Sequence, residues 1–397
     1  MTSIILVLNV GSSSIKFAAY PAGGNETPML RGKIAGIGTD PRFTLSGAGM
    51  DAATFGPISA DAGQEDLTVR LLRWLDADTA LGPVVGVGHR VVHGGTEFSA
   101  PVRIDARVLE TLAALEPLAP LHQPFNLAAI RAVAARHPDL PQIACFDTAF
   151  HQSQGELARL FALPRRFAAR GVLRYGFHGL SYEFIAGELP RHLGDRADGR
   201  VVVAHLGNGA SMCAMHGRKS VATSMGFTAL DGLVMGRRCG TLDAGVVLYM
   251  QREMGMSADE IEDVLYRQSG LLGVSGISPD MRVLEDSDDP KAREAIDLFC
   301  YRAAMTLAGL VAALGGLDAI VFTAGIGENS ARIRRLICER LDWLGVSLDP
   351  DANTANATRI GKAGSRCDVL VLPTDEECVI ARSTKRLLGA GRLASGH

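Results

Sequence analysis

Long apolar runs are missing from this 397-residue sequence. The most apolar extended segment, Ala303 to Leu317, is shorter than the roughly 20 residues that span a bilayer, and we interpret it as a buried helix. The N-terminal run Ile4 to Leu8 is too short for a signal peptide, and no basic region precedes it. We therefore expect a cytoplasmic protein with no membrane partner.

A surplus of one charge and clustered cysteines are also lacking. The net charge of −3 leaves no broad basic surface, which argues against nucleic acid as a partner. The seven cysteines are scattered, odd in number and free of any C-x-x-C pair. This spacing matches neither a disulfide framework nor a zinc finger, and it is typical of a reduced compartment.

Two well-known nucleotide-binding fingerprints are absent. The pairs Gly32-Lys33 and Gly361-Lys362 are followed by Ile and Ala, so neither forms a Walker A motif. The glycine-rich segment 325–330 has Ser330 at its sixth position, where a dinucleotide fingerprint requires glycine or alanine. Any nucleotide must therefore be bound by turns of a different design.

The sequence does contain a regular alternation of strand-like and helix-like segments. Hydrophobic residues make up 47% and charged residues 21%, as in an ordinary globular protein, and the alternation predicts an α/β fold. Strands are expected at 3–10, 15–20, 84–89, 141–146, 200–205, 211–216, 318–323 and 368–372. Helices are expected near 65–76, 105–116, 124–136, 181–190, 243–254, 258–267, 290–315, 330–341 and 375–387. Segments 38–64 and 343–367 are interpreted as loops or excursions, and a domain boundary is expected within 152–170.

One strand–turn–strand design occurs twice. The apolar run at 4–8 leads into a polar turn at 9–14, which includes Ser12 and Ser14 and is followed by Lys16 on the returning strand. A second unit runs from the strand at 201–206 through the turn at 207–211. Turns rich in backbone N–H groups and hydroxyls, one of them beside a lysine, suit a polyphosphate. A plain surface turn is the alternative for either copy alone.

A third glycine-rich turn, 325–330, follows the strand expected at 319–323 and opens a helix that Asn329 or Ser330 can cap. Such a turn lets a nucleotide approach the backbone closely, although a helix-capping turn without a ligand is the alternative.

Polar groups also stand at predicted strand ends and in loops. Arg90 follows one apolar strand, and Asp147 ends another; an N-cap is the alternative for this aspartate. His178 and Arg238 lie in glycine-flanked loops, where the alternatives are a simple turn histidine and a solvent-exposed pair of arginines, Arg237 and Arg238. Phosphate-binding turns, a strand-end carboxylate and loop cations together are the groups that phosphoryl transfer requires.

Nine motifs then give the sequence a specific resemblance, which extends from about Ile4 to Arg382. They are NVGSSSIK, GHRVVHGG, APLHQP, FDTAFH, YGFHGLSY, HLGNGAS, TSMGFTALDGL, FTAGIGENS and PTDEE. The chain resembles the acetate and short-chain-acid kinases, a branch of the sugar kinase, heat-shock chaperone and actin superfamily. The resemblance implies two duplicated actin-like (ribonuclease H-like) domains with an active-site cleft between them, at 1–150 and 151–382. It also implies that a C-terminal helix at about 383–397 returns to the first domain, and that the second domain carries the interface of a homodimer.

The same resemblance implies a role for individual residues. Asn9 and Glu376 correspond to the site of Mg²⁺, or of Mn²⁺ in its place. Arg90 corresponds to the group that holds the substrate carboxylate, and Asp147, His178 and Arg238 to the catalytic groups. The pocket for the acyl methyl group corresponds to Val92, Leu121, Phe177 and Ala229. Contacts with ATP correspond to Lys16, His205, Leu206, Gly207, Asn208, Gly209, Asp280, Met281, Arg282, Gly325, Ile326, Gly327, Glu328 and Asn329.

Four positions depart from the family's pattern. Ala229 stands in place of proline in the acyl pocket, which bears on the preferred acyl length. Asp375 replaces asparagine, Met281 replaces an aromatic residue and Arg237 replaces threonine, and these three bear on nucleotide or metal affinity.

The implied reaction is reversible, magnesium-dependent phosphoryl transfer from ATP to acetate. The alternatives are a propionate or butyrate kinase with a larger pocket and, more distantly, an actin-like ATP switch without catalysis. The acceptor carboxylate is already ionised, so we expect Asp147 to orient magnesium or water, with proton transfer as the alternative role.

Overall fold

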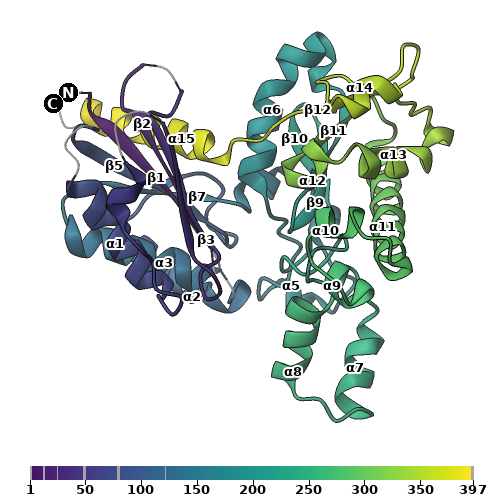
Figure 1. Ribbon diagram of the computed structural model, residues 1–397, viewed down its shortest axis with the longest axis horizontal. Helices are drawn as coiled ribbons and strands as arrows, with labels where there is room; N and C mark the ends of the chain where they lie inside the picture. Colours follow the sequence, from purple (N-terminus) through teal and green to yellow (C-terminus); the bar gives the residue numbers. More distant parts are fainter. Residues whose placement is uncertain are drawn as a thin grey trace. The chain divides into compact units, whose positions relative to one another are not determined.

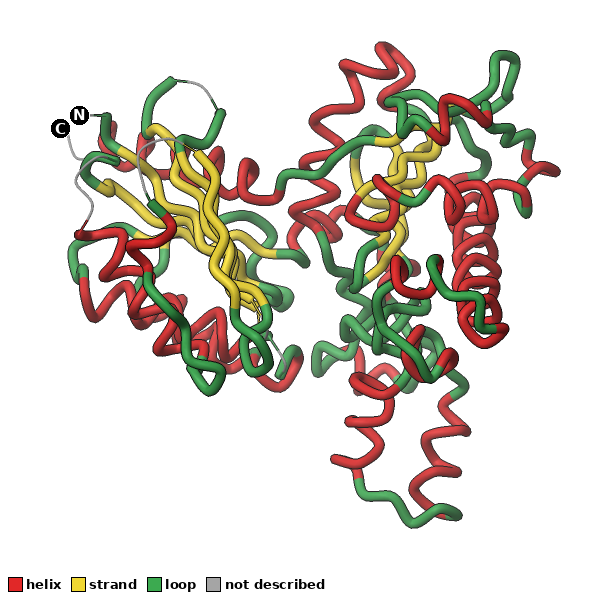
Figure 2. Tube along the Cα trace, in the orientation of Figure 1, coloured by secondary structure: helices red, strands yellow, loops and turns green. Residues whose placement is uncertain are grey.

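The computed structural model describes residues 2–11, 14–24, 26–47, 51–77, 81–120 and 122–394. The chain forms two compact units, Met1–Phe150 with Asp375–His397, and His151–Thr374. Both units are α/β (Figures 1 and 2). The chain returns to the first unit at Asp375, earlier than the expected residue 383.

The first unit is built on a seven-stranded sheet of order β4-β3-β2-β1-β5-β7-β6. The strands are β1 (Ile4–Gly11), β2 (Ser14–Pro21), β3 (Leu30–Ala35), β4 (Arg42–Gly47), β5 (Val84–Val91), β6 (Val102–Arg103) and β7 (Gln142–Phe146). β1, β5 and β7 are parallel, whereas β2, β3, β4 and β6 pair antiparallel with their neighbours. The carboxyl ends of the three parallel strands therefore meet at one edge of the sheet.

Helices cover both faces of this sheet: α1 (Gln64–Ala77), α2 (Ala106–Ala114), α3 (Gln123–Arg136) and α15 (Glu376–Ala394). Alternate residues of β1, such as Leu6 and Leu8, belong to the core cluster that also contains residues of α1 and α3. Glycines on β5 admit α15 on the other face, because a Cβ at Gly88 would overlap Ile380 and Thr384 (Figure 1).

The expectation of a loop at 38–64 was wrong for its first part, which contains β4. Phe43 of β4 stacks on Phe55 with ring centroids 4.2 Å apart, and both rings meet the edge of Trp74 in α1. β4 lies at the edge of the sheet, and its residues alternate between half-buried and exposed. An edge strand needs only one apolar face, so its sequence is polar enough to resemble a loop.

The second unit contains a five-stranded sheet of order β10-β9-β8-β11-β12. Its strands are β8 (Arg200–Leu206), β9 (Ala210–His216), β10 (Lys219–Thr223), β11 (Ala319–Thr323) and β12 (Asp368–Val371). β8, β11 and β12 are parallel, and β9 and β10 are antiparallel to their neighbours. This is the pattern of β3-β2-β1-β5-β7 in the first unit, so the predicted duplication is present in both sheets.

The helices of the second unit pack around this sheet, with α6 and α11 on opposite faces (Figure 1). They are α4 (Glu156–Arg159), α5 (Arg165–Ala168), α6 (Gly179–Leu193), α7 (Ala244–Arg252), α8 (Ala258–Asp263), α9 (Gly270–Ser275), α10 (Met281–Glu285), α11 (Pro290–Leu314), α12 (Ala324–Asn329), α13 (Ala331–Glu339) and α14 (Pro350–Thr354). Within the described part of the chain, α11 alone is long and apolar enough to cross a membrane, but half of its most apolar stretch is buried in the protein.

Candidate active site

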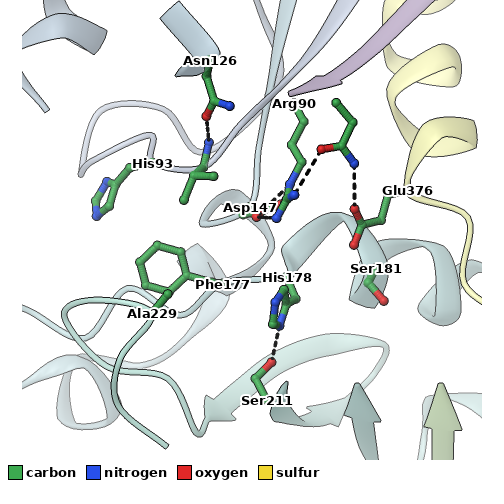
Figure 3. A network of polar contacts seen from close by, with 12 residues as sticks. Arg90, His93, Asn126, Asp147, Phe177, His178, Ser181, Ser211, Ala229 and Glu376 are labelled. Carbon is green, nitrogen blue, oxygen red and sulfur yellow. Dashed lines mark hydrogen bonds and ion pairs between the residues drawn. The ribbon is translucent and has the colours of Figure 1, made fainter. Parts of the chain in front are cut away.

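The first unit brings Arg90 and Asp147 together at the edge where its parallel strands end. Arg90 lies near the end of β5, and Asp147 directly follows β7, the next strand in the sheet. The Asp147 amide donates to Val91 O over 3.1 Å, which continues the pairing of the two strands. The Arg90 Nε atom lies 3.1 Å from both carboxylate oxygens of Asp147, and Nη2 forms an ion pair with Oδ2 (Figure 3).

Asn9 and Glu376 extend this pair into a network. Arg90 Nη1 donates to Asn9 Oδ1 over 3.2 Å, and Asn9 Nδ2 donates to Glu376 Oε2 over 3.4 Å. Asn9 comes from β1, and Glu376, labelled in Figure 3, is the first residue of α15. Four residues predicted from distant parts of the sequence are thus connected by hydrogen bonds within one unit.

Burial and charge act in opposite directions on this network. Burial lowers the pKa of Arg90, but Asp147 and Glu376 outweigh that effect and raise it above its ordinary value, so the guanidinium stays charged. Burial raises the pKa of Asp147, and the charge of Arg90 opposes that rise. The Asp147 side chain is 1% exposed and that of Arg90 is 20% exposed, so the arginine is the member of the pair that a small ligand can reach.

Amide side chains on α3 hold the loop after β5, and the sequence did not identify them. Asn126 Oδ1, shown in Figure 3, accepts from the Val92 amide over 3.0 Å. Asn126 Nδ2 donates to Val10 O over 2.6 Å. Gln123 binds both backbone groups of His93, each over 3.1 Å. Gln123 belongs to the APLHQP motif at the start of α3, whereas Asn126 lies just after that motif. The buried Val92 side chain is therefore rigidly placed, whereas Leu121 lies outside the described residues.

The tip of the first hairpin is described only in part. Ser12 lies outside the described residues, and Ser14 begins β2 opposite Gly11. Lys16 pairs with Asn9 across the hairpin, and its side chain is exposed.

The second unit places His178 at the start of α6 in a left-handed conformation, with φ of 59°. Its Nδ1 atom lies 2.8 Å from Ser211 Oγ (Figure 3). Its ring stacks on that of His205 with centroids 4.2 Å apart. The preceding Phe177 is buried, and its carbonyl lies 2.9 Å from His151 Nε2. Contacts on several sides thus fix the imidazole of His178.

Arg238 converges with His178 on the turn between β8 and β9. A Cβ placed on Gly209 would lie 2.8 Å from Arg238 Nη2 and 3.5 Å from His178 Nε2. Arg238 Nη1 donates to Ala229 O over 2.6 Å, and the Gly236 amide donates to Asn208 O over 2.9 Å. Because Gly209 has no side chain, a guanidinium and an imidazole can both border this turn.

The third glycine-rich turn is helical, and it forms the short helix α12. Ser330, one of the two expected caps, accepts from the Ile333 amide and caps α13, whereas Asn329 Nδ2 donates to Gly325 O over 2.8 Å. Glu328 Oε1 accepts from the amides of Ala324 (2.8 Å) and Thr374 (3.4 Å), so this carboxylate serves the backbone.

Arg334 supports α12 through hydrogen bonds to its backbone, and no feature of the sequence predicted this role. Its side chain is fully buried, and Nη1 donates to Gly327 O over 2.9 Å and to Glu328 O over 3.0 Å. Helix carbonyls that lack an intrahelical partner are thereby satisfied.

Asp280, Met281 and Arg282 lie at the start of α10. Asp280 caps that helix and pairs with the exposed Arg282, whereas the Met281 side chain is buried in the second unit. None of the described contacts joins these three residues to His178 or Arg238.

Known proteins resemble this chain over its whole length. The model of the acetokinase family matches residues 4–382. An acetate kinase of Rhodopseudomonas palustris is 54% identical over 398 residues, covering 99% of this chain and 100% of that protein. A propionate kinase of Francisella tularensis has a TM-score of 0.88 at 37% identity, covering 97% of this chain and 99% of that structure. An acetate kinase of Porphyromonas gingivalis has a TM-score of 0.82 at 33% identity, covering 97% of this chain and 100% of that structure.

The predicted motifs, the paired sheets and these full-length matches agree, and the chain belongs to the acetokinase family.

Proposed function

We propose that this chain transfers the γ-phosphoryl group of ATP to the carboxylate of acetate, forming acetyl phosphate and ADP in a reversible reaction. The observation that carries this function is the convergence of Arg238 and His178 on the turn at Gly209. Negative charge spreads over the equatorial oxygens of a phosphoryl group during its transfer, and fixed hydrogen-bond donors in this position stabilise that charge. Similarity to proteins named acetate kinase supports acetate as the acceptor.

Arg90 is the group we assign to the acetate carboxylate. A guanidinium presents five N–H donors in a planar fork. Asp147 contacts the edge formed by Nε and Nη2, and Asn9 contacts Nη1. The arginine is held charged and partly exposed, which suits the capture of a small anion.

Asp147 then acts by orienting Arg90 and not as a base. Both of its carboxylate oxygens are engaged by the guanidinium. Acetate, like Asp and Glu side chains, has a pKa of roughly 4 to 5 and is ionised at neutral pH, so the nucleophile has no proton to lose.

Magnesium is the metal we expect, with manganese as a substitute. Among the described residues no cluster of three or more His, Cys, Asp or Glu could hold a metal ion. Asn9 and Glu376 carry the kind of oxygen that Mg²⁺ prefers, and this ion is commonly bound by one or two protein oxygens together with substrate phosphates and water. Asn9 Nδ2 faces Glu376 and Asn9 Oδ1 accepts from Arg90, so Asn9 Oδ1 would exchange its contact with Arg90 for the ion. When bound, it would neutralise charge on the ATP phosphates. Asn9 and Glu376 hold each other in place for that role.

ATP is assigned to the turn at 207–209, to α12 and to the start of α10, with Lys16 on the first hairpin. The buried Arg334 and the backbone contacts of Glu328 keep α12 in shape, so its glycines can present backbone to the nucleotide. Since the Met281 side chain is buried, a contact from that position would come from its backbone.

Acetate is favoured over propionate by the rigidity of Val92. This side chain is β-branched, and its backbone is held by Asn126, so it yields little to a longer acyl chain. Phe177 is buried, and Ala229 leaves more room than the proline common in the family. One methylene changes discrimination by about 1–3 kcal/mol in an apolar pocket. Propionate is therefore the expected second acceptor.

A homodimer is the expected assembly, formed through the second unit. α7 has no buried residue although it contains Val246, Leu248 and Tyr249, which are all exposed. Tyr301 and Met305 on α11 are also exposed. Exposed apolar surface of this kind is typical of a protein–protein interface. Every copy of the chain carries the same surface, so a second copy is a suitable partner for it.

Tyr249→Glu should give a monomer by light scattering, whereas Trp343→Glu, at another exposed aromatic, should leave the dimer intact. A monomeric wild-type protein would contradict the assignment.

Hydroxylamine trapping tests the function directly. Wild-type protein with ATP, Mg²⁺ and acetate should form acetohydroxamate, and omission of any one of these should abolish it. EDTA should also abolish the product, and excess Mg²⁺ should restore it.

An acceptor panel should rank acetate above propionate and propionate above butyrate by kcat/KM. A preference for propionate would overturn the acetate assignment, and ATP hydrolysis with no acyl product would overturn the transferase. Because ATP is a metabolite of the cell interior, a cytoplasmic location goes with this function.

A further inference from the structure

The imidazole of His178 is backed by two hydroxyl groups in series. Ser211 Oγ, on β9, lies 2.8 Å from His178 Nδ1 and 2.5 Å from the Oη atom of Tyr182, on α6. Tyr182 and Ser211 are both fully buried. Figure 3 shows the contact between Ser211 and His178. The spacing makes each neighbouring pair a hydrogen bond, so the positions of the two hydroxyl protons are coupled.

The chemistry of the two hydroxyls favours one arrangement of their protons. A phenol is a better hydrogen-bond donor and a poorer acceptor than a serine hydroxyl, and burial raises the pKa of Tyr182 well above its ordinary value, so the phenol is protonated and is the better donor across its 2.5 Å contact with Ser211. Ser211 has a single proton, and among the described residues its hydroxyl contacts Tyr182 and His178. That proton is therefore donated to Nδ1 of His178. A neutral imidazole that accepts at Nδ1 carries its hydrogen on Nε2.

The Nε2 side of the ring is the side that borders the turn at Gly209, together with Arg238 Nη2. Rotation of the ring is opposed by the stack on His205, whose plane is 18° from that of His178. The backbone is held as well, because His151 contacts the carbonyl of the preceding Phe177.

We propose that Tyr182 and Ser211 are positioning residues that fix His178 as its Nε2–H tautomer. The hydrogen-bond donor that faces the transferring phosphoryl group is then present before ATP binds. The catalytic meaning of this tautomer rests on the proposed function, whereas the tautomer itself is a property of the free protein.

Nitrogen NMR of the full-length protein tests the tautomer without any activity measurement. With histidine labelled at both ring nitrogens, the His178 signals are assigned by their loss in His178→Gln. The expected result near pH 7.5 is a protonated Nε2 and an unprotonated Nδ1, with a mixture of tautomers in Ser211→Ala. A protonated Nδ1 in the wild-type protein, alone or in a doubly protonated ring, overturns the proposal.

Steady-state kinetics test the consequence. Tyr182→Phe removes one hydroxyl and should lower kcat by about tenfold, the scale typical of lost second-layer hydrogen bonds, while KM for acetate and ATP stays within about twofold. Tyr175→Phe is the matched control, because it removes a hydroxyl that donates to Gly171 O over 2.8 Å in the same unit, and its kcat should not change. An unchanged kcat in Tyr182→Phe overturns the positioning role. If the wild-type protein forms no acetyl phosphate, the proposed function fails while the NMR result still decides the tautomer; if a variant does not fold, the wild-type spectrum decides it.

Discussion

Replacement of Arg238 by alanine should lower kcat far more than it raises either KM. The substitution removes the Nη2 group that borders Gly209, together with the 2.6 Å hydrogen bond from Nη1 to Ala229 O. Loss of one preorganised donor to a developing charge costs about 2.7–4 kcal/mol, which corresponds to a decrease in kcat of about 10²- to 10³-fold. The Arg238 backbone keeps its own bond, since its carbonyl accepts from the Met235 amide over 3.1 Å, so the loop should retain its shape.

The assay is acetohydroxamate formation with ATP and acetate both saturating. Arg238→Lys should recover part of the lost rate, because it restores the charge but not the planar fork. Arg267→Ala is the matched control, since the side chain of this arginine forms an exposed ion pair with Asp263, four residues earlier in the chain. A kcat near the wild-type value in Arg238→Ala, or a loss confined to KM, would refute the assignment of Arg238 to the phosphoryl group.

Four further outcomes are expected. Arg90→Ala should raise KM for acetate by at least about tenfold, because it removes a ground-state contact, and an unchanged acetate KM would place the carboxylate elsewhere. Asp147→Asn should lose most activity, on the order of 10²-fold, with no recovery as the pH is raised; recovery in alkaline buffer would instead identify a base. Val92→Ala should shift the ratio of kcat/KM values towards propionate by up to about 10-fold, and an unaltered ratio in the acceptor panel would exclude Val92 from the pocket. Burial lowers the pKa of His89 to about 4, so between pH 4 and 6.5 the unfolded state binds a proton that the folded state does not. In urea unfolding, the free energy of unfolding should keep its full His89 contribution above pH 6.5 and decrease as the pH falls towards 4, by up to about 1.4 kcal/mol per pH unit for this group. This part of the decrease should be absent in His89→Gln.

Most of the parallel and hairpin strands could be predicted because buried strands are continuous apolar runs. β1, β5, β7, β8 and β11 all have this character. Edge strands such as β4 and β10 were missed, because one exposed face dilutes the apolar signal. The helicity of 324–329 was also missed, since a glycine-rich turn gives no helical periodicity.

The candidate site could be predicted as residue types but not as a network. Arg90 and Asp147 stood out at strand ends, yet their mutual ion pair joins residues 57 positions apart and depends on the adjacency of β5 and β7. Arg334 was invisible, because an arginine on an amphipathic helix normally faces solvent, and only the structure shows that carbonyls surround it. The role of Asn126 could not be predicted for the same reason, because its side-chain amide forms hydrogen bonds with backbone groups of two other segments.

Glu328 joins two parts of the second unit through a single oxygen atom. Oε1 receives the amide of Ala324, where α12 begins, and the amide of Thr374, the last residue before the chain leaves this unit. A substitution that removes this oxygen therefore disturbs the start of a glycine-rich helix and the end of the unit's chain together. Glutamine keeps an acceptor oxygen in the same place, so shape and not charge is what position 328 has to supply to these two amides.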